Sequence, residues 1–567
     1  MHAEAPVAAG STASFVEWWS APGRPGWVSD GHTGIGLPLS FAGLVRGGWW
    51  LQDSAAPWAA PPPGLVEAQP PLAWADSASV VLGEDSAWEG FGGGIVRART
   101  FFTPSLNMKP RAVFTFVNGS SAIERNSLFL TRSDRRHWLR IGSTGQRRGG
   151  VGALNLSAEH LWTVDGGLRR GAHTLRTHFT QRGLGASLRY PLTESGRGES
   201  GELGYDWARG EWRSMVTLER GWDGRVSSDA SLGSTFREGR RDAQQTRIVS
   251  ELTHTRGDHI EAVRLWARQG RVVRRYSDGE RTVWDERALW AASRVERPWQ
   301  WGTLEMQLGG GWSDASRRNR ERAQLAPGLA WRHADDRVQL RLFTERVLDP
   351  IWSDLSPSAR PFVQNTWVGG LQVGTGSIRR RWIEGALLLG RTGNKATLVP
   401  YPLRDIQLRI GYQSESRAKE FALATLEAGI RGRVGSLEVS TFALARDRDG
   451  QRWIDPGTGA RLAAETGFSA FTGDLGVRLR LETAYVGARE TDIGSSIVGG
   501  FDEEVLPAFA TLAASVAVTL GDATIVVRAD DLEDERRPQV WLDLLTGRPA
   551  LGTGRQLRAS LIWPFFN

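Results

Sequence analysis

The sequence predicts an all-β protein, namely a large antiparallel transmembrane β-barrel of about 22 strands, preceded by a small N-terminal region of different composition. Three observations predict this fold. From about residue 111 onward, segments of roughly 9 to 14 alternating residues follow one another, separated by polar turns. Before about residue 105 the chain is instead rich in Pro, Gly and Trp. The final strand has one wholly apolar face that ends in aromatic residues.

The N-terminal region contains a glycine-rich stretch, VVLGEDSAWEGFGGGIVRART, at 80–100. It does not fit a Walker loop, which needs a lysine directly after its last glycine, because Lys109, Lys395 and Lys419 are the only lysines and none follows a glycine. It does not fit a dinucleotide fingerprint either, since IVRART predicts a strand where that motif needs a helix. We therefore expect these glycines to be structural, allowing tight bends and close strand approach.

The strands of the long region are illustrated by LGVRLRLETAY at 475–485. In an extended chain one face carries Leu475, Val477, Leu479, Leu481, Thr483 and Tyr485, and the other carries Arg478, Arg480, Glu482 and Ala484. A helix would spread leucines and arginines around its whole circumference. The pattern predicts a strand, and it recurs at 184–190, 337–344, 404–412 and 512–520.

A sheet with so many strands must close or split, because open edges invite aggregation. A β-propeller would show repeats of about forty residues, and 26 tryptophans make that alternative worth testing, but no fixed period is found. A transmembrane barrel uses strands of about 9 to 11 residues, with apolar side chains facing lipid and charged ones facing the lumen. Trp162, Trp222, Trp312 and Trp382 are candidates for its interfacial aromatic girdles.

The last residues, GRQLRASLIWPFFN, predict the closing strand of such a barrel. One face is apolar and ends in aromatics: Leu557, Ala559, Leu561, Trp563 and Phe565 alternate with Arg558, Ser560, Ile562 and Pro564. Pro564 lacks a ladder hydrogen-bond donor and is expected where the strand ends.

Composition limits the other possibilities. The chain has 567 residues, a net charge of +7 and no cysteine, so disulfides and thiolate metal sites are excluded. Nearly all the basic residues are arginines, spread among 63 acidic ones rather than gathered on one face, so a nucleic-acid partner is disfavoured. No run reaches the ~18 apolar residues of a membrane-spanning helix.

The glycine stretch resembles the end of the plug domain in TonB-dependent outer-membrane receptors. The matching positions, after a valine-rich strand, are Gly83, Ser86, Gly90, Gly93, Gly94 and Thr100. Two positions depart from the family's pattern: Ser79 stands where an acidic residue is favoured, and Glu89 where a tyrosine is favoured. The C-terminal region resembles the family's closing sequence at Asp531, Leu532, Asp534, Gly554, Arg555, Trp563 and Phe565, with Asp531 where asparagine is usual.

The resemblance implies a small plug-like domain over residues 1–102 that lies in the barrel lumen and is shorter than a complete plug, a linker over 103–110 and a barrel over 111–567. It further implies a bacterial outer-membrane receptor that imports a scarce ligand, such as a metal chelate, a cofactor or an oligosaccharide. The implied partners are outer-membrane lipid, the barrel-assembly machinery and a TonB-type inner-membrane complex. No N-terminal energy-coupling box is evident, so a passive or structural barrel with a vestigial plug stays an alternative.

No enzyme activity is predicted, because neither a G-x-S-x-G elbow nor an H-E-x-x-H motif occurs. His254, Asp258, His259 and Glu261 cluster in sequence, but strand spacing divides them between two faces, so neither a metal site nor a cofactor is expected there. A third alternative is a secreted, tryptophan-rich propeller or sandwich that binds glycans. Blade repeats or solubility without detergent would support that alternative.

Overall fold

The structure is a computed structural model. It describes residues 110–565 apart from connecting segments at 121–122, 135, 152–153, 189–191, 232–233, 277–278, 280, 315–322, 335–337, 352–361, 376–380, 394, 404–406, 416–418, 435, 449–457, 492–503, 535–537, 544–547 and 552–553. Of the first 109 residues it describes 2–6, 40–41, 44–45, 49–51, 77–81, 86–89 and 96–101.

Within the described residues, 22 antiparallel strands form one closed barrel. These strands are β7 (Arg111–Gly119), β8 (Ile123–Ser133), β9 (His137–Val151), β10 (Leu154–Arg170), β11 (His173–Leu188), β12 (Leu192–Arg209), β13 (Trp212–Ser231), β14 (Ser234–Arg256), β15 (His259–Tyr276), β16 (Arg281–Trp299), β17 (Gly302–Ser313), β18 (Ala323–Ala334), β19 (Val338–Ile351), β20 (Phe362–Thr375), β21 (Arg381–Gly393), β24 (Lys419–Val434), β25 (Leu437–Arg448), β26 (Thr458–Ala470), β27 (Leu475–Val486), β30 (Phe509–Leu520), β31 (Ala523–Asp530) and β34 (Gln556–Phe565). Neighbours in sequence pair with one another, and the last strand pairs with the first, with Phe565 opposite Ala112. The predicted fold class is confirmed.

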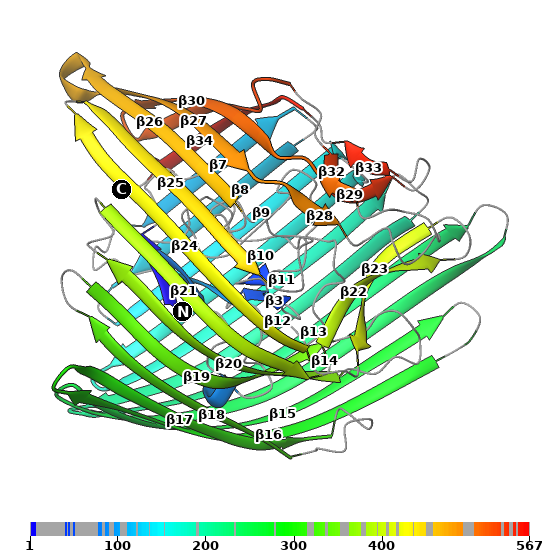
Figure 1. The fold of residues 1–567 in the computed structure, drawn as a ribbon, viewed down its shortest axis with the longest axis vertical. Coiled ribbons are helices and arrows are strands. Elements are labelled where there is room, and N and C mark those ends of the chain that lie inside the picture. The colour runs from blue at the N-terminus through cyan, green and yellow to red at the C-terminus, as the bar shows by residue number, and fades with distance from the viewer. Residues whose placement is uncertain are drawn as a thin grey trace.

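The two ends of the barrel differ. At one end, called the turn end here, two-residue turns join β10 to β11, β12 to β13, β14 to β15 and β30 to β31. The opposite, loop end carries three additional hairpins, which Figure 1 shows on the right: β22 (Lys395–Leu403) with β23 (Gln407–Glu415), β28 (Arg489–Thr491) with β29 (Glu504–Leu506), and β32 (Pro538–Asp543) with β33 (Arg548–Leu551). Outer-membrane barrels have this asymmetry, with short periplasmic turns and longer extracellular loops.

The wall of the barrel is inverted relative to a soluble protein. Along β8, Arg125, Ser127 and Thr131 are buried on the lumenal side, while Leu128 and Leu130 are exposed on the outside. In β27, Leu479, Leu481 and Tyr485 are likewise exposed. A wall with apolar residues outside and polar residues inside is stable only when lipid surrounds it. In the part of the chain that is described, no helix has the length and apolar character needed to cross a membrane.

Exposed aromatic residues mark the height of the lipid-facing band. At the turn end, Trp212, Trp299, Trp301 and Trp563 lie outside the barrel. Trp222 follows Trp212 on β13 by ten residues and, by strand alternation, faces the same side. Ten residues at about 3.3 Å each and a tilt of about 40° rise roughly 25 Å, the height of an outer-membrane apolar band.

The girdle candidates fit this geometry in part. Trp162 is half-exposed and lies nine residues before the turn at Gly171, and Trp312 lies ten residues after Gly302. Together with Trp222 they stand about one membrane thickness from the turn end. Trp382 is the second residue of β21 and so lies near the turn end instead; its side chain is outside the described part of the structure.

The N-terminal segments form small elements of their own. A four-stranded sheet has the order β1-β5-β6-β4 and is built from β1 (His2–Pro6), β4 (Trp49–Leu51), β5 (Ser77–Val81) and β6 (Val96–Phe101). The other elements are β2 (Ser40–Phe41), which pairs with β3 (Leu44–Val45), and the short helix α2 (Ser86–Glu89). In Figure 1 these blue elements lie within the outline of the barrel.

Candidate binding surface in the barrel lumen

The glycine stretch is only partly described. Gly83, Gly90, Gly93 and Gly94 lie outside the described residues, Ser86 is the first residue of α2, and Thr100 lies in β6, where it pairs with Ala78. The strand predicted after the glycines is therefore present as β6. Helix α2 was not predicted, because four residues between glycines show no helical periodicity.

Helix α2 packs against the inner wall of the barrel. Ala87 and Trp88 are buried in one apolar cluster with wall residues Val249, Ala262, Trp266, Ala288, Trp290, Ala292 and Ala326. The indole N–H of Trp290 donates a hydrogen bond to the backbone carbonyl of Ala87 at 3.0 Å. The guanidinium of Arg264 lies over the ring of Trp88, 5.8 Å from its centroid. The N-terminal segment is thus held to the wall by a buried hydrogen bond and by aromatic packing.

Gly309 on β17 is what allows this close approach. A Cβ built at this position would lie 2.8 Å from the carbonyl carbon of Ala87 and 2.6 Å from Cζ2 of Trp290. Both distances are shorter than side chains tolerate, so any larger residue would push α2 or the Trp290 ring away. The neighbouring Gly310 faces outward, where a Cβ would meet the end of the Leu325 side chain at 3.1 Å and the Gln324 carbonyl oxygen at an ordinary 3.7 Å.

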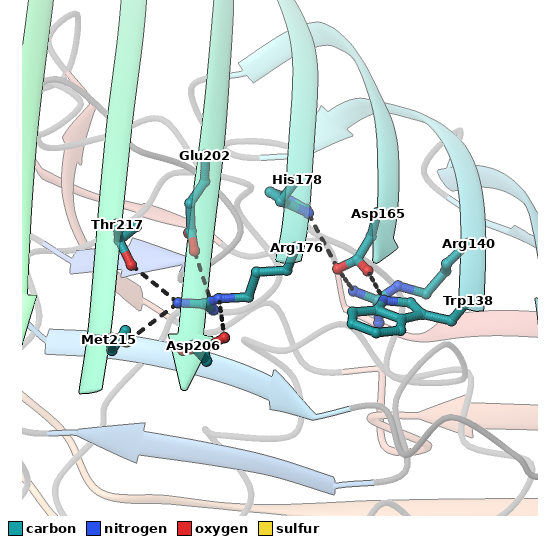
Figure 2. A network of polar contacts seen from close by, with 9 residues as sticks. All are labelled: Trp138, Arg140, Asp165, Arg176, His178, Glu202, Asp206, Met215 and Thr217. Atoms are coloured by element: carbon teal, nitrogen blue, oxygen red, sulfur yellow. Dashed lines mark hydrogen bonds and ion pairs between the residues drawn. The ribbon is translucent and has the colours of Figure 1, made fainter. Parts of the chain in front are cut away.

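Arginine and carboxylate side chains line the lumen near the turn end as paired networks. One network centres on Asp165 of β10, which accepts hydrogen bonds from Trp138 Nε1 at 2.9 Å and from Arg140 at 3.0 Å. His178 Nδ1 lies 3.6 Å from the same carboxylate (Figure 2). Each member comes from a different strand or from alternate residues of one strand, so the strand register assembles the group.

A second network centres on Arg176 of β11. Its guanidinium lies 3.1 Å from Glu202 and 3.3 Å from Asp206, both on β12, and it donates to Thr217 on β13 at 3.2 Å (Figure 2). Figure 2 shows the Arg176 and Asp165 networks side by side on consecutive strands. The lumenal surface here offers charged hydrogen-bonding groups with little net charge.

The same pairing occurs elsewhere on the wall. Glu305 of β17 is 5% exposed and lies 2.6 Å from Arg332 of β18 and 3.0 Å from Arg294 of β16. Asp530 of β31 pairs with Arg528 and with Arg558 of β34. Because buried charges are costly unless paired, these contacts hold neighbouring strands in register.

The first five residues of the C-terminal signature, from Asp531 to Arg555, lie close together at the loop end. Asp531 and Asp534 adopt left-handed backbone conformations, with φ of 54° and 60°. Asp534 Oδ1 accepts the backbone N–H of Arg555 at 2.8 Å, and the Arg555 guanidinium donates to the carbonyl of Leu532 at 3.0 Å. Gly554 lies directly against Asp534. These contacts join the end of β31 to the start of β34.

The aromatic end of the signature lies on the outside of the barrel at the turn end. Trp563 is half-exposed, and its ring lies 5.8 Å from that of Phe565. The role of these residues as a recognition signal stays a prediction.

The histidine and acidic cluster around residue 254 lies outside the barrel, at the turn end. The expected division between two faces is wrong, because the turn at 257–258 reverses the chain: His254 pairs with Glu261, and both share the outer face with His259. His254 stacks on Trp212, and its Nε2 lies 3.2 Å from Glu211, while its Nδ1 is 4.0 Å from Glu261. Across the described residues, no group of three or more His, Asp or Glu side chains is arranged to hold a metal ion.

These features define the class of the protein: a 22-stranded barrel of the kind that spans bacterial outer membranes, with polar networks in its lumen and a short N-terminal helix docked on its inner wall.

Solved structures with this fold cover the whole chain. The chain is similar to the copper transporter OprC, with a TM-score of 0.78 and 11% identity over 100% of this chain and 98% of the other. It is similar to the ferric yersiniabactin uptake receptor FyuA from Yersinia pestis, with a TM-score of 0.74 and 12% identity over 100% of this chain and 98% of the other. It is also similar to the siderophore receptor PirA from Acinetobacter baumannii, with a TM-score of 0.73 and 10% identity over 100% of this chain and 98% of the other. The fold is that of the bacterial outer-membrane receptors. No family model and no curated protein sequence matches the chain.

Proposed function

We propose that the chain is an outer-membrane receptor that captures a scarce ligand and imports it through the barrel. The observation that carries this proposal is the docking of α2 on the inner wall. Trp290 hydrogen-bonds to Ala87, Gly309 leaves room for Ala87, and Arg264 lies over the ring of Trp88. A passive pore gains nothing from such a contact. A receptor needs it, because the lumen must stay closed until a ligand has bound.

The proposed ligand is a metal chelate, a cofactor or an oligosaccharide, captured at the loop end. The hairpins β22–β23, β28–β29 and β32–β33 gather there. The similar structures named as transporters and receptors of copper, ferric yersiniabactin and siderophores make a metal chelate the first class to test. The paired lumenal arginines and carboxylates would give a polar ligand hydrogen-bonding groups along its path without trapping one sign of charge.

Two further parts of the proposal follow from the sequence resemblance. Residues 1–102 would form the plug-like domain, residues 103–110 a linker and residues 111–567 the barrel. A TonB-type inner-membrane complex would supply energy by acting on the plug-like domain. The barrel-assembly machinery would read the last strand, where Trp563 and Phe565 stand outside the wall.

Binding of a ligand panel to the refolded full chain tests the proposal. Ferric and cupric chelates, corrinoid or haem cofactors and oligosaccharides are titrated while tryptophan fluorescence is followed. The proposal expects saturable binding of one class. Absence of binding by every class, together with steady conductance of the full chain in a planar bilayer, would instead establish the passive pore.

A further inference from the structure

Three consecutive hairpins at the turn end share a sequence pattern: an arginine, a glycine, one further residue, and then a histidine or a tryptophan. The three copies are Arg170-Gly171-Ala172-His173, Arg209-Gly210-Glu211-Trp212 and Arg256-Gly257-Asp258-His259. They join β10 to β11, β12 to β13 and β14 to β15. The glycines have φ of 58°, 60° and 58°, the left-handed conformation that two-residue hairpins require.

This turn geometry sets each arginine beside an aromatic or imidazole ring. Arg170 pairs across the hairpin with His173, Arg209 with Trp212, and Arg256 with His259. Residues directly opposite each other in an antiparallel pair lie on the same face of the sheet. Trp212 lies outside the barrel, and alternation along the strands places the other pairs outside as well. The three arginines, called the turn arginines here, therefore stand at the aromatic girdle.

The turn arginines differ from the lumenal arginines in their partners. Arg140, Arg176 and Arg332 each lie within 3.3 Å of a carboxylate. No described residue forms an ion pair with the side chain of Arg170, Arg209 or Arg256. All three are exposed. An exposed guanidinium with no carboxylate partner is free to bind an anion from the surroundings.

The neighbouring side chains favour a lipid phosphate as that anion. His173 stacks on Tyr205 and hydrogen-bonds its hydroxyl at 2.7 Å, and His254 stacks on Trp212. Amphipathic rings of this kind sit at the level of the lipid headgroups. Arginine binds phosphate through two parallel N–H groups, and each arginine near an anionic lipid surface strengthens binding about fivefold.

We propose that Arg170, Arg209 and Arg256 form a row of binding sites for the phosphate groups of anionic glycerophospholipids at the turn end. Each site consists of one guanidinium and the adjacent ring across its hairpin. The first two sites are expected to be the stronger ones. In the second hairpin, Glu211 is engaged by His254 at 3.2 Å. The third hairpin carries an acidic residue, Asp258, in its turn, and its charge reduces the attraction of Arg256 for an anion.

The test is native mass spectrometry of the detergent-solubilised full chain, titrated with phosphatidylglycerol and, separately, with zwitterionic phosphatidylcholine. The test variant carries Arg170→Gln, Arg209→Gln and Arg256→Gln together. The matched control carries Arg197→Gln, Arg240→Gln and Arg271→Gln. These control arginines also face outward and lose the same charge, but they are already paired with Glu199, Asp242 and Asp285 at 2.7, 3.1 and 3.6 Å.

The parent chain is expected to retain up to three phosphatidylglycerol molecules, each about fivefold more tightly than phosphatidylcholine. The test variant is expected to lose this preference and the control to keep it. If the test variant fails to give the heat-dependent gel shift of a folded barrel, the three single variants decide, each losing one retained lipid. Equal retention by parent and test variants, or equal loss in the control, would overturn the proposal.

Discussion

Replacing Gly309 with alanine should weaken the docking of α2 on the wall without altering the barrel. The new Cβ would lie 2.8 Å from the carbonyl carbon of Ala87 and 2.6 Å from Trp290, so either α2 or the indole ring must move. Movement costs the hydrogen bond between Trp290 and Ala87, about 1 kcal/mol, and overpacking adds about 1 kcal/mol at the low end of its range. Together these weaken the docking of α2 by roughly 2 kcal/mol, or about 30-fold in its equilibrium.

The assay uses a cysteine reporter, which is specific because the chain has no cysteine of its own. Ala87→Cys places a thiol in the buried cluster, where a soluble maleimide reaches it only when α2 leaves the wall. We expect Gly309→Ala to raise the labelling rate about 30-fold in the refolded full chain. Gly310→Ala is the matched control, since its Cβ points outward toward Leu325. An unchanged rate in Gly309→Ala, or an equal rise in Gly310→Ala, would refute the reasoning.

Three further predictions concern the wall and its turns. Glu305→Gln removes the carboxylate shared by two lumenal arginines and should destabilise the barrel by about 3 kcal/mol in thermal gel-shift assays. The control Glu199→Gln, at a more exposed ion pair, should cost less than about 1 kcal/mol. Equal shifts in the two variants would argue against the lumenal pairing. Gly554→Ala places a Cβ 2.8 Å from Asp534 Oδ1 at a φ of 71°, so the yield of refolded barrel should fall, and an unchanged yield would contradict this. Two backbone N–H groups donate to Asp134 in the exposed turn after β8 and lower its pKa. The contribution of Asp134 to stability is therefore present above its ordinary pKa and lost as pH falls through the lowered pKa. The difference in melting temperature between the parent and Asp134→Ala should shrink in acid, and a difference that widens would contradict this sign.

The strands could be predicted because their signal is local. In β27 the alternation of Leu479 and Leu481 with Arg480 is enough to predict both the strand and its two faces, and the structure places the leucines outside. The positions of Trp162 and Trp222, one membrane span from the turn end, follow from the same periodicity. The closing strand was likewise evident from its apolar face.

The docking of α2 and the lumenal networks could not be predicted in this way. Ala87 and Trp290 are 203 residues apart, and nothing in the four residues of α2 indicates its partner. The group of Glu305, Arg294 and Arg332 depends on the register of three strands, which a shift of one residue would destroy. Such contacts depend on global topology, whereas alternation is a property of each strand alone.

The most direct test of the account is the conductance of the refolded full chain in a planar bilayer, after a heat-dependent gel shift has shown that the barrel formed. A chain that begins at residue 110 serves as the open reference, since it retains every barrel strand but lacks α2. The account predicts that the reference conducts steadily and that the full chain is silent, because the proposed plug-like domain would close the lumen. Steady open channels in the full chain would contradict it and identify a passive pore.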